Sequence, residues 1–119
     1  MTDRLAVEVV TTTPGEARLA MRGDVDIAAD EALAAAYTEA AATGATRVVL
    51  DFADVDYINS TGIALIVRML AEARRDHREV SALGLSDHYR EIFRITRLSD
   101  YLTIADPQPT TSVPEEAAR

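Results

Sequence analysis

Residues 56–67 read DYINSTGIALIV and join two segments with different apolar periods. Before them, residues 47–52 (RVVLDF) are rich in apolar and β-branched residues, which is typical of a strand. After them, apolar side chains recur at helical spacing, at Ile63, Ile66, Val67 and Leu70. Ser60 and Thr61 are therefore expected where a strand ends and a helix begins. Because the first N–H groups of a helix lack internal partners, a serine there could cap the helix or carry a phosphate.

Size and composition indicate one globular domain. The chain has 119 residues, 48% of them hydrophobic and all in short segments. No segment approaches the roughly 20 apolar residues that cross a bilayer, and the first residues do not resemble a secretory signal. The absence of cysteine excludes thiol catalysis, disulfides and thiolate metal sites. We expect a soluble, cytoplasmic protein.

The charge balance points to a protein partner. The net charge is −8, and an acidic chain is repelled by phosphate backbones and anionic lipids, so we expect no binding to nucleic acid or membranes. All twelve cationic residues are arginine. The lack of lysine excludes Schiff-base chemistry and the lysine of a phosphate-binding loop.

The first half of the chain predicts a hairpin followed by a helix. Residues 4–10 and 17–21 read as strands joined by a Thr-Pro-Gly turn. Asp26 is placed to cap a helix over residues 27–42, and Gly44 is placed to end it. The apolar stripe of this helix comprises Leu33, Ala36, Tyr37, Ala40 and Ala41.

The second half predicts alternating strands and helices. The expected elements are a strand at 46–52 covered on both faces, a helix at 61–75, a strand at 80–84, a helix at 87–97 with Ile92, Phe93 and Ile95 facing inward, and a strand at 102–104. The order β-β-α-β-α-β-α-β predicts an α/β domain in which a small mixed sheet is backed by helices. We place this domain at residues 1–106. Residues 107–119 contain three prolines and few apolar side chains, so we expect a disordered tail.

Two side chains of the 61–75 helix fall outside its expected core stripe. At 100° per residue, Leu65 and Met69 project beside the charged side of the helix. We therefore expect them to be exposed and to bind a partner; the alternative is that they widen the core contact of the helix.

Several kinds of active site fit the sequence poorly. Asp51 could be the acceptor of a phosphoacceptor receiver, but the lysine and paired acidic residues of that family are missing. Ser60 lacks the Gly-x-Ser-x-Gly pattern of a nucleophile elbow. The histidines, His77 and His88, lie in polar segments. The spacing of the acidic residues matches no known metal motif, and we interpret these residues as caps and turns: Asp24, Asp26, Asp51, Asp54 and Asp56. We expect no enzyme, no metal and no cofactor.

Residues 48–65, VVLDFADVDYINSTGIAL, closely resemble the signature of STAS domains, in particular the bacterial anti-sigma factor antagonists. In that family, a strand of the type V-L-D-L and a short loop precede D-S-[ST]-G at the start of a helix. Residues 23–26, GDVD, match the family's G-[DE]-x-D. The resemblance covers nearly all of residues 4–105 and implies the STAS fold.

The resemblance also implies a phosphorylation site at Ser60, followed by Thr61 and Gly62. Asp26 falls on an acidic residue near that loop. Asn59 departs from the aspartate that usually precedes the phosphoserine. The implied partner-binding residues, together with those argued above, are Asp24, Asp26, Leu65 and Met69.

The implied function is regulation of transcription by partner switching. The chain would bind an anti-sigma factor that is also a serine kinase of the GHKL type, and so free a sigma factor. Phosphorylation of Ser60 would end binding, and a PP2C-type phosphatase would restore it. The alternative is a STAS adaptor that is not phosphorylated, in a signalling scaffold or a lipid-transport complex.

Overall fold

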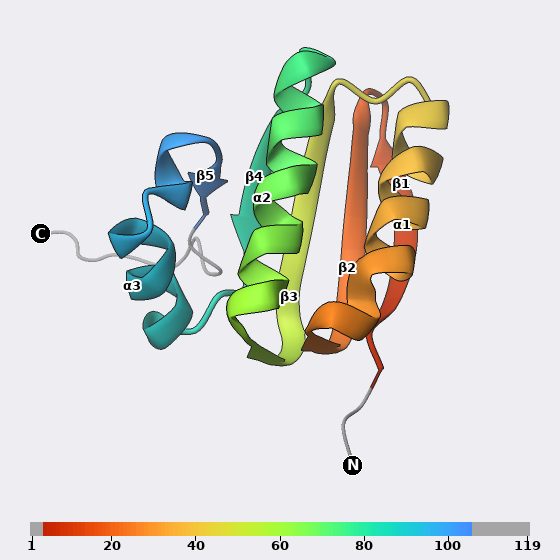
Figure 1. The fold of residues 1–119 in the computed structure, drawn as a ribbon. Coiled ribbons are helices and arrows are strands. Elements are labelled where there is room, and N and C mark those ends of the chain that lie inside the picture. The colour runs from red at the N-terminus through yellow and green to blue at the C-terminus, as the bar shows by residue number, and fades with distance from the viewer. Residues whose placement is uncertain (1–3, 106–119) are drawn as a thin grey trace, which may run out of the picture.

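The computed structural model describes residues 4–105, which form a five-stranded sheet with three helices (Figure 1). The predicted tail at 107–119 lies outside the described residues. The strands are β1 (Ala6–Thr13), β2 (Glu16–Val25), β3 (Arg47–Ile58), β4 (Glu79–Leu83) and β5 (Thr103–Ile104). The helices are α1 (Asp30–Ala42), α2 (Ser60–Arg75) and α3 (Asp87–Ile95), with short 3-10 turns η1 (Ile27–Ala29) and η2 (Leu98–Asp100).

The sheet is mixed, as its element order predicts. Its strand order is β1-β2-β3-β4-β5; β1 and β2 form an antiparallel hairpin, and the remaining neighbours are parallel. β1 is therefore one edge of the sheet. A register irregularity interrupts its pairing with β2 between Val10 and Thr13.

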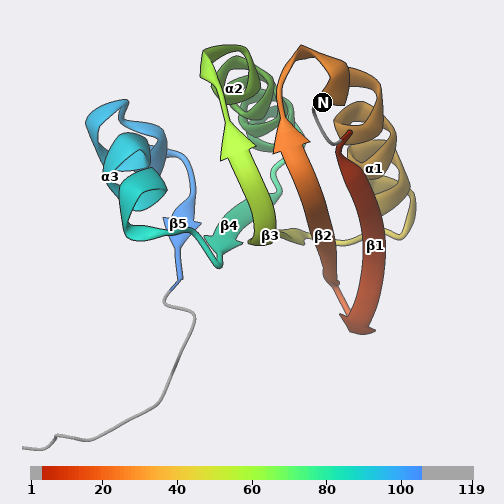
Figure 2. The same cartoon turned by 90° about the horizontal axis from the view of Figure 1, so that it is seen from below.

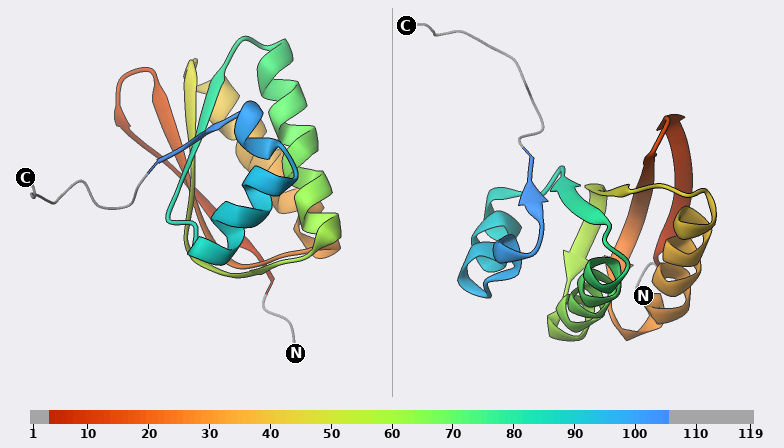
Figure 3. Two further views of the ribbon diagram at one scale, coloured as in Figure 1. Left: turned by 90° about the vertical axis from the view of Figure 1, so that its left-hand side faces the viewer. Right: turned by 90° about the horizontal axis from the view of Figure 1, so that it is seen from above.

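The helices cover one face of the sheet. α1 and α2 lie side by side over the strands, and the edge-on view places all three helices on the same side (Figures 2 and 3). Alternate residues of β2 face them and are buried: Ala17, Leu19, Met21, Gly23 and Val25. On the other face, Arg18 and Arg22 are exposed. Within residues 4–105, no helix covers that face.

β3 differs from its prediction in length and in burial. It continues to Ile58, six residues beyond the predicted end at Phe52. Phe52 is buried on the helix side, whereas its neighbour Asp51 is only partly buried. The expectation that this strand is covered on both faces holds at Val49, which is buried, and is wrong from Asp51 onward, because the crossover helices pack on one side only.

The buried stripe of α2 was predicted only in part: Ile66 and Leu70 are buried as expected. Leu65 and Met69 are 7% and 5% exposed, whereas Val67, which we assigned to the core, is 45% exposed. The cause is α1, which packs along the Leu65 side of α2 and forms an ion pair from Asp30 to Arg68. The expected exposed surface at Leu65 and Met69 does not exist.

α3 packs on the core through the aromatic residues Phe93 and Tyr89. Phe93 is fully buried and meets Phe52 edge to face, with ring centroids 5.7 Å apart. Ile92 is half-buried. Ile95 was expected to face inward, but it is 65% exposed because the helix ends there and turns away at Thr96.

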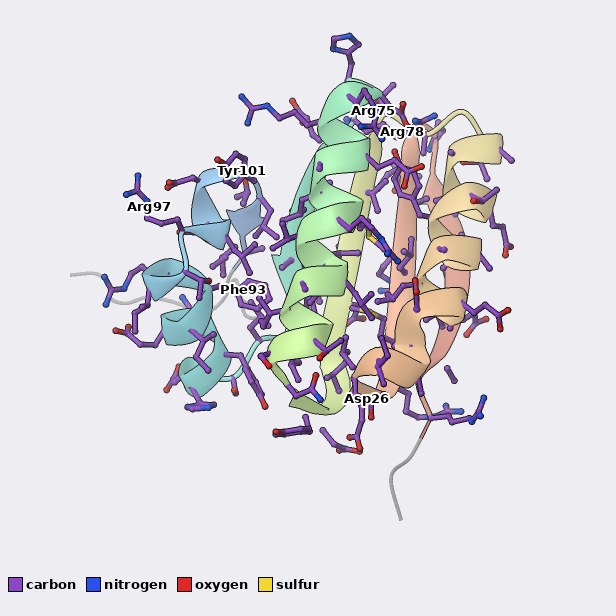
Figure 4. All side chains as sticks on the ribbon, viewed as in Figure 1. Asp26, Arg75, Arg78, Phe93, Arg97 and Tyr101 are labelled. Carbon is purple, nitrogen blue, oxygen red and sulfur yellow. The ribbon has the colours of Figure 1, made fainter. Side chains whose placement is uncertain are left out.

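A polar cluster joins the far ends of α1 and α2. The Tyr37 hydroxyl donates to Asp76 Oδ2 at 2.8 Å, and the Arg78 guanidinium reaches both side chains. Arg78 also donates to the carbonyl of Ala45 at 2.8 Å, which links the cluster to the start of β3. Arg78 and Asp26 mark opposite ends of the molecule in Figure 4.

Candidate functional site

The site begins at the junction between β3 and α2. Asn59 separates Ile58 from Ser60, and its extended backbone ends the strand. Its side-chain oxygen accepts a hydrogen bond from the Gly62 N–H at 2.8 Å, and its carbonyl accepts one from the Ile63 N–H at 2.9 Å. Asn59 is therefore the N-cap of α2. The interpretation in which Ser60 caps the helix is wrong.

Ser60 is the first residue of α2, and its side chain is exposed. Across the described part of the chain, its hydroxyl makes no hydrogen bond. The 16-residue helix directs its positive end toward this hydroxyl. Thr61, beside it, is half-buried. The arrangement leaves one hydroxyl open to a modifying enzyme in a field that favours an anion.

Gly62 lets the first turn of α2 pack directly on the end of β2. A Cβ added at this position would lie 1.9 Å from the carbonyl oxygen of Val25. The same carbonyl accepts a hydrogen bond from the Asn59 N–H at 3.2 Å. Because the backbone of Gly62 has no unusual φ, the requirement for glycine here is one of space.

The predicted acidic residues gather at the same end of the sheet. Asp26 follows β2 and accepts from the Ala28 N–H at 3.0 Å, so it caps η1 as predicted, while α1 itself begins at Asp30. Asp24 pairs across the sheet with Tyr57. The strand pairing and the bond from the Asn59 N–H to the Val25 carbonyl therefore bring Asp24 and Asp26 to the end of the sheet where Ser60 lies. Figure 4 labels Asp26 at this end. The structure buries Leu65 and Met69 in the core, away from this surface.

Sequence reasoning missed three exposed apolar residues near the junction. Ile27 and Tyr57 are 67% and 53% exposed, and Val67 lies two helical turns beyond Ser60 on the same outer side of α2. The signal for Val67 was present, because an alternative helical stripe through Leu65, Ile66 and Met69 leaves it outside. Nothing in the local pattern marks Ile27 or Tyr57.

The remaining candidates for chemistry do not assemble into a site. Asp51 accepts from the Ala53 N–H at 3.0 Å, a local contact within β3 where its pairing with β2 is irregular. His77 and His88 are exposed, His77 at the end of α2 and His88 at the start of α3. In residues 4–105, no three acidic or histidine side chains come together to hold a metal ion. No helix in the same range is long and apolar enough to cross a membrane.

The fold and the junction together define a small α/β domain with an exposed hydroxyl at the start of a helix. A family model described as Mlab, STAS domain, matches residues 9–104. The chain belongs to the STAS domain family.

Its similar relatives are named as anti-sigma factor antagonists, which are regulatory proteins rather than enzymes. BtrV of Bordetella bronchiseptica, named as an anti-sigma factor antagonist, is 30% identical over 86 residues, or 72% of this chain and 74% of BtrV. The anti-sigma-B factor antagonist of Staphylococcus aureus is 28% identical over 82 residues, covering 69% of this chain and 76% of that protein.

Solved structures share the fold. The anti-sigma factor antagonist SpoIIAA in its unphosphorylated form matches with a TM-score of 0.68 and 19% identity, covering 87% of this chain and 90% of that one. SpoIIAA of Bacillus in its phosphorylated form matches with a TM-score of 0.67 and 20% identity, covering 87% of this chain and 93% of that one. An anti-sigma factor antagonist from Mycobacterium paratuberculosis matches with a TM-score of 0.70 and 17% identity, covering 89% of this chain and 86% of that one.

Proposed function

We propose that this chain is an anti-sigma factor antagonist controlled at Ser60. Unphosphorylated, it binds an anti-sigma factor that is also a GHKL-type serine kinase, and a sigma factor is released. The kinase phosphorylates Ser60, which ends binding, and a PP2C-type phosphatase reverses the step. One observation carries this proposal: Asn59, and not Ser60, caps α2, so the exposed Ser60 hydroxyl is available for phosphorylation.

A phosphate on Ser60 would change binding more than folding. It adds about −1.5 to −2 charges and three acceptor oxygens at the positive end of α2, where the helix dipole compensates them. The cap from Asn59 to Gly62 does not use the Ser60 hydroxyl, so it can persist. A partner packed against Ser60 would meet a bulky dianion, and a loss of about 1–3 kcal/mol weakens binding by roughly one to two decades. The relative SpoIIAA, solved in both forms, supports this proposal.

The partner surface combines acidic and apolar residues around Ser60. Asp24 and Asp26 lie at the end of β2, with Ile27 and Tyr57 exposed next to them in the chain or across the sheet. Val67 extends the surface along α2. Large apolar side chains exposed together near one polar site are typical of protein interfaces.

Asn59 supports the alternative of an adaptor without a phosphoswitch. Its amide oxygen is engaged by the Gly62 N–H, and the side chain carries no charge. If a kinase requires a carboxylate before the serine, Ser60 is a poor substrate. The chain would then act as a constitutive adaptor in a signalling scaffold or a lipid-transport complex.

Kinase treatment separates the two proposals. We would incubate the protein and its Ser60→Ala variant with ATP and each purified small GHKL-type kinase encoded in the source genome, and then measure intact mass. One phosphate on the wild type and none on the variant supports the switch. If the wild type stays unmodified while Asn59→Asp becomes phosphorylated, the adaptor is favoured.

Binding measurements test the consequence of the switch. We would measure affinity by calorimetry against the kinase that binds the wild type. Ser60→Ala should keep the wild-type affinity. Ser60→Glu should lose only part of it, since glutamate carries a single charge and a phosphate carries more. Val67→Ser should weaken binding, whereas Ile95→Ser, which removes a more exposed apolar side chain on α3, should not. Equal affinities of the Ala and Glu variants contradict control at Ser60.

A further inference from the structure

The end of β3 is held by a side chain from α3. The Tyr89 hydroxyl accepts a hydrogen bond from the Ile58 N–H at 3.0 Å and lies 3.4 Å from the Ile58 carbonyl oxygen, to which it can donate. Ile58 is two residues before Ser60 in the chain, while Tyr89 is 31 residues beyond Ile58. One hydroxyl therefore satisfies both backbone groups of the last residue of the strand.

Tyr89 takes the place of a missing strand. β4 pairs with β3 only as far as Asp51, so the last part of β3 lacks a strand neighbour on that side. Backbone groups of successive strand residues point to alternate sides. Asn59 donates toward β2, to the Val25 carbonyl, and Ile58 points the other way, toward α3. Without the tyrosine hydroxyl, the Ile58 N–H has no acceptor within residues 4–105.

The contact is a hydrogen bond more than a close-packed fit. A small cavity of about 180 Å³ lies between the end of β3 and the start of α3, and Val55, Ile58 and Tyr89 line it. The half-buried Tyr89 ring has room to shift toward this cavity once its hydroxyl is removed.

We propose that Tyr89 is a positioning residue of the Ser60 junction, which makes α3 a second element that sets the geometry of the switch. The hydroxyl holds Ile58 on one side while Val25 holds Asn59 on the other, and the first turn of α2 starts from this pair. A displacement of α3 is then transmitted to Ser60. The part of this inference that concerns phosphorylation rests on the proposed function.

The chain offers a matched control for the test. Tyr89→Phe removes the hydroxyl at the junction, and Tyr37→Phe removes a hydroxyl that bonds to Asp76 at the opposite end of α2. Both variants lose the hydrogen bonds of a tyrosine hydroxyl and keep the ring, which is buried in Tyr37 and half-buried in Tyr89. Amide hydrogen exchange, read by NMR on the full-length protein without a partner, reports the junction directly at Asn59 and Gly62.

In Tyr89→Phe, the amides of Asn59 and Gly62 should exchange about fivefold faster relative to the amide of Leu19 in the core of β2. A fivefold change is what the loss of one hydrogen bond, about 1 kcal/mol, produces. Tyr37→Phe should leave that ratio unchanged. The kcat/KM for phosphorylation of Ser60 should fall about fivefold in Tyr89→Phe alone. Unchanged junction exchange, equal changes in both variants, or unchanged phosphorylation despite faster exchange each overturn the inference. If the wild type is never phosphorylated, the switch fails, and exchange alone decides whether Tyr89 positions the junction.

Discussion

Replacing Gly62 with alanine should destabilise the domain, although it places a better helix former inside a helix. In an isolated helix, Gly→Ala stabilises by about 1 kcal/mol. Here the new Cβ would lie 1.9 Å from the Val25 carbonyl oxygen and 2.7 Å from its carbon. Both atoms are backbone, so the clash cannot be relieved by a rotamer change.

The size of the effect follows from the shift required. To reach an ordinary contact of 3.4 Å, the start of α2 must retreat by about 1.5 Å. That movement lengthens the bond from Asn59 to Val25, now 3.2 Å, beyond hydrogen-bonding distance. One lost hydrogen bond costs about 1 kcal/mol and overpacking costs about 1–3 kcal/mol, so the net loss after the propensity gain is about 1–3 kcal/mol.

Urea unfolding followed by circular dichroism measures this loss. The control is Gly44→Ala, because a Cβ at Gly44 meets nothing within 4 Å but its φ of +81° is unfavourable for alanine. It should cost about 1 kcal/mol through backbone strain alone. If Gly62→Ala is as stable as the wild type or more stable, the tight contact between α2 and β2 is refuted.

Three further outcomes are expected. Asn59→Ala should lower the free energy of unfolding by about 1 kcal/mol, because it removes the cap of α2. Asn59→Asp should keep the wild-type stability at pH 7, because aspartate also caps helices. Equal midpoints for the two variants in thermal melts would contradict the capping role of Asn59. Burial and, to a smaller extent, the hydrogen bond to Asp76 raise the pKa of Tyr37, so the folded state favours the neutral phenol. The resulting contribution to folding stability is present below about pH 10 and is lost as the pH rises through the raised pKa. Unfolding measured from pH 8 to 11 should therefore depend less on pH in Tyr37→Phe, and an identical profile would exclude this contribution. Removal of residues 107–119 should leave the thermal midpoint unchanged, because they contain few apolar residues, and a drop of several degrees would show that they pack on the domain.

Features set by local chemistry could be predicted from the sequence. The hairpin turn, the cap at Asp26 and the end of α1 before Gly44 depend on residues within a few positions of each other. The strand-to-helix junction at Ser60 was also predicted, because the apolar period changes there. The element order then determined the mixed sheet with its helices.

Features set by distant packing could not be predicted in the same way. Two apolar stripes overlap on α2, one through Ile63 and Val67 and one through Leu65 and Met69. The second is buried because α1 docks beside it, and no pattern within the helix records where another helix will lie. The tie from Tyr89 to Ile58 spans 31 residues and was missed for the same reason.

The exposed edge of β1 has a consequence for how the protein behaves at high concentration. Its eight residues, AVEVVTTT, are rich in β-branched side chains and contain a single charge, Glu8. An edge strand of this kind is a template for pairing with another copy, and charges or irregularities are what normally prevent it. Glu8, the irregularity after Val10 and the overall charge of −8 are then the features that keep neighbouring molecules apart. Solubility should therefore decline near the isoelectric point of about 4.6, where the net charge no longer separates the molecules. Only Glu8 and the irregularity after Val10 then oppose pairing of the β1 edges.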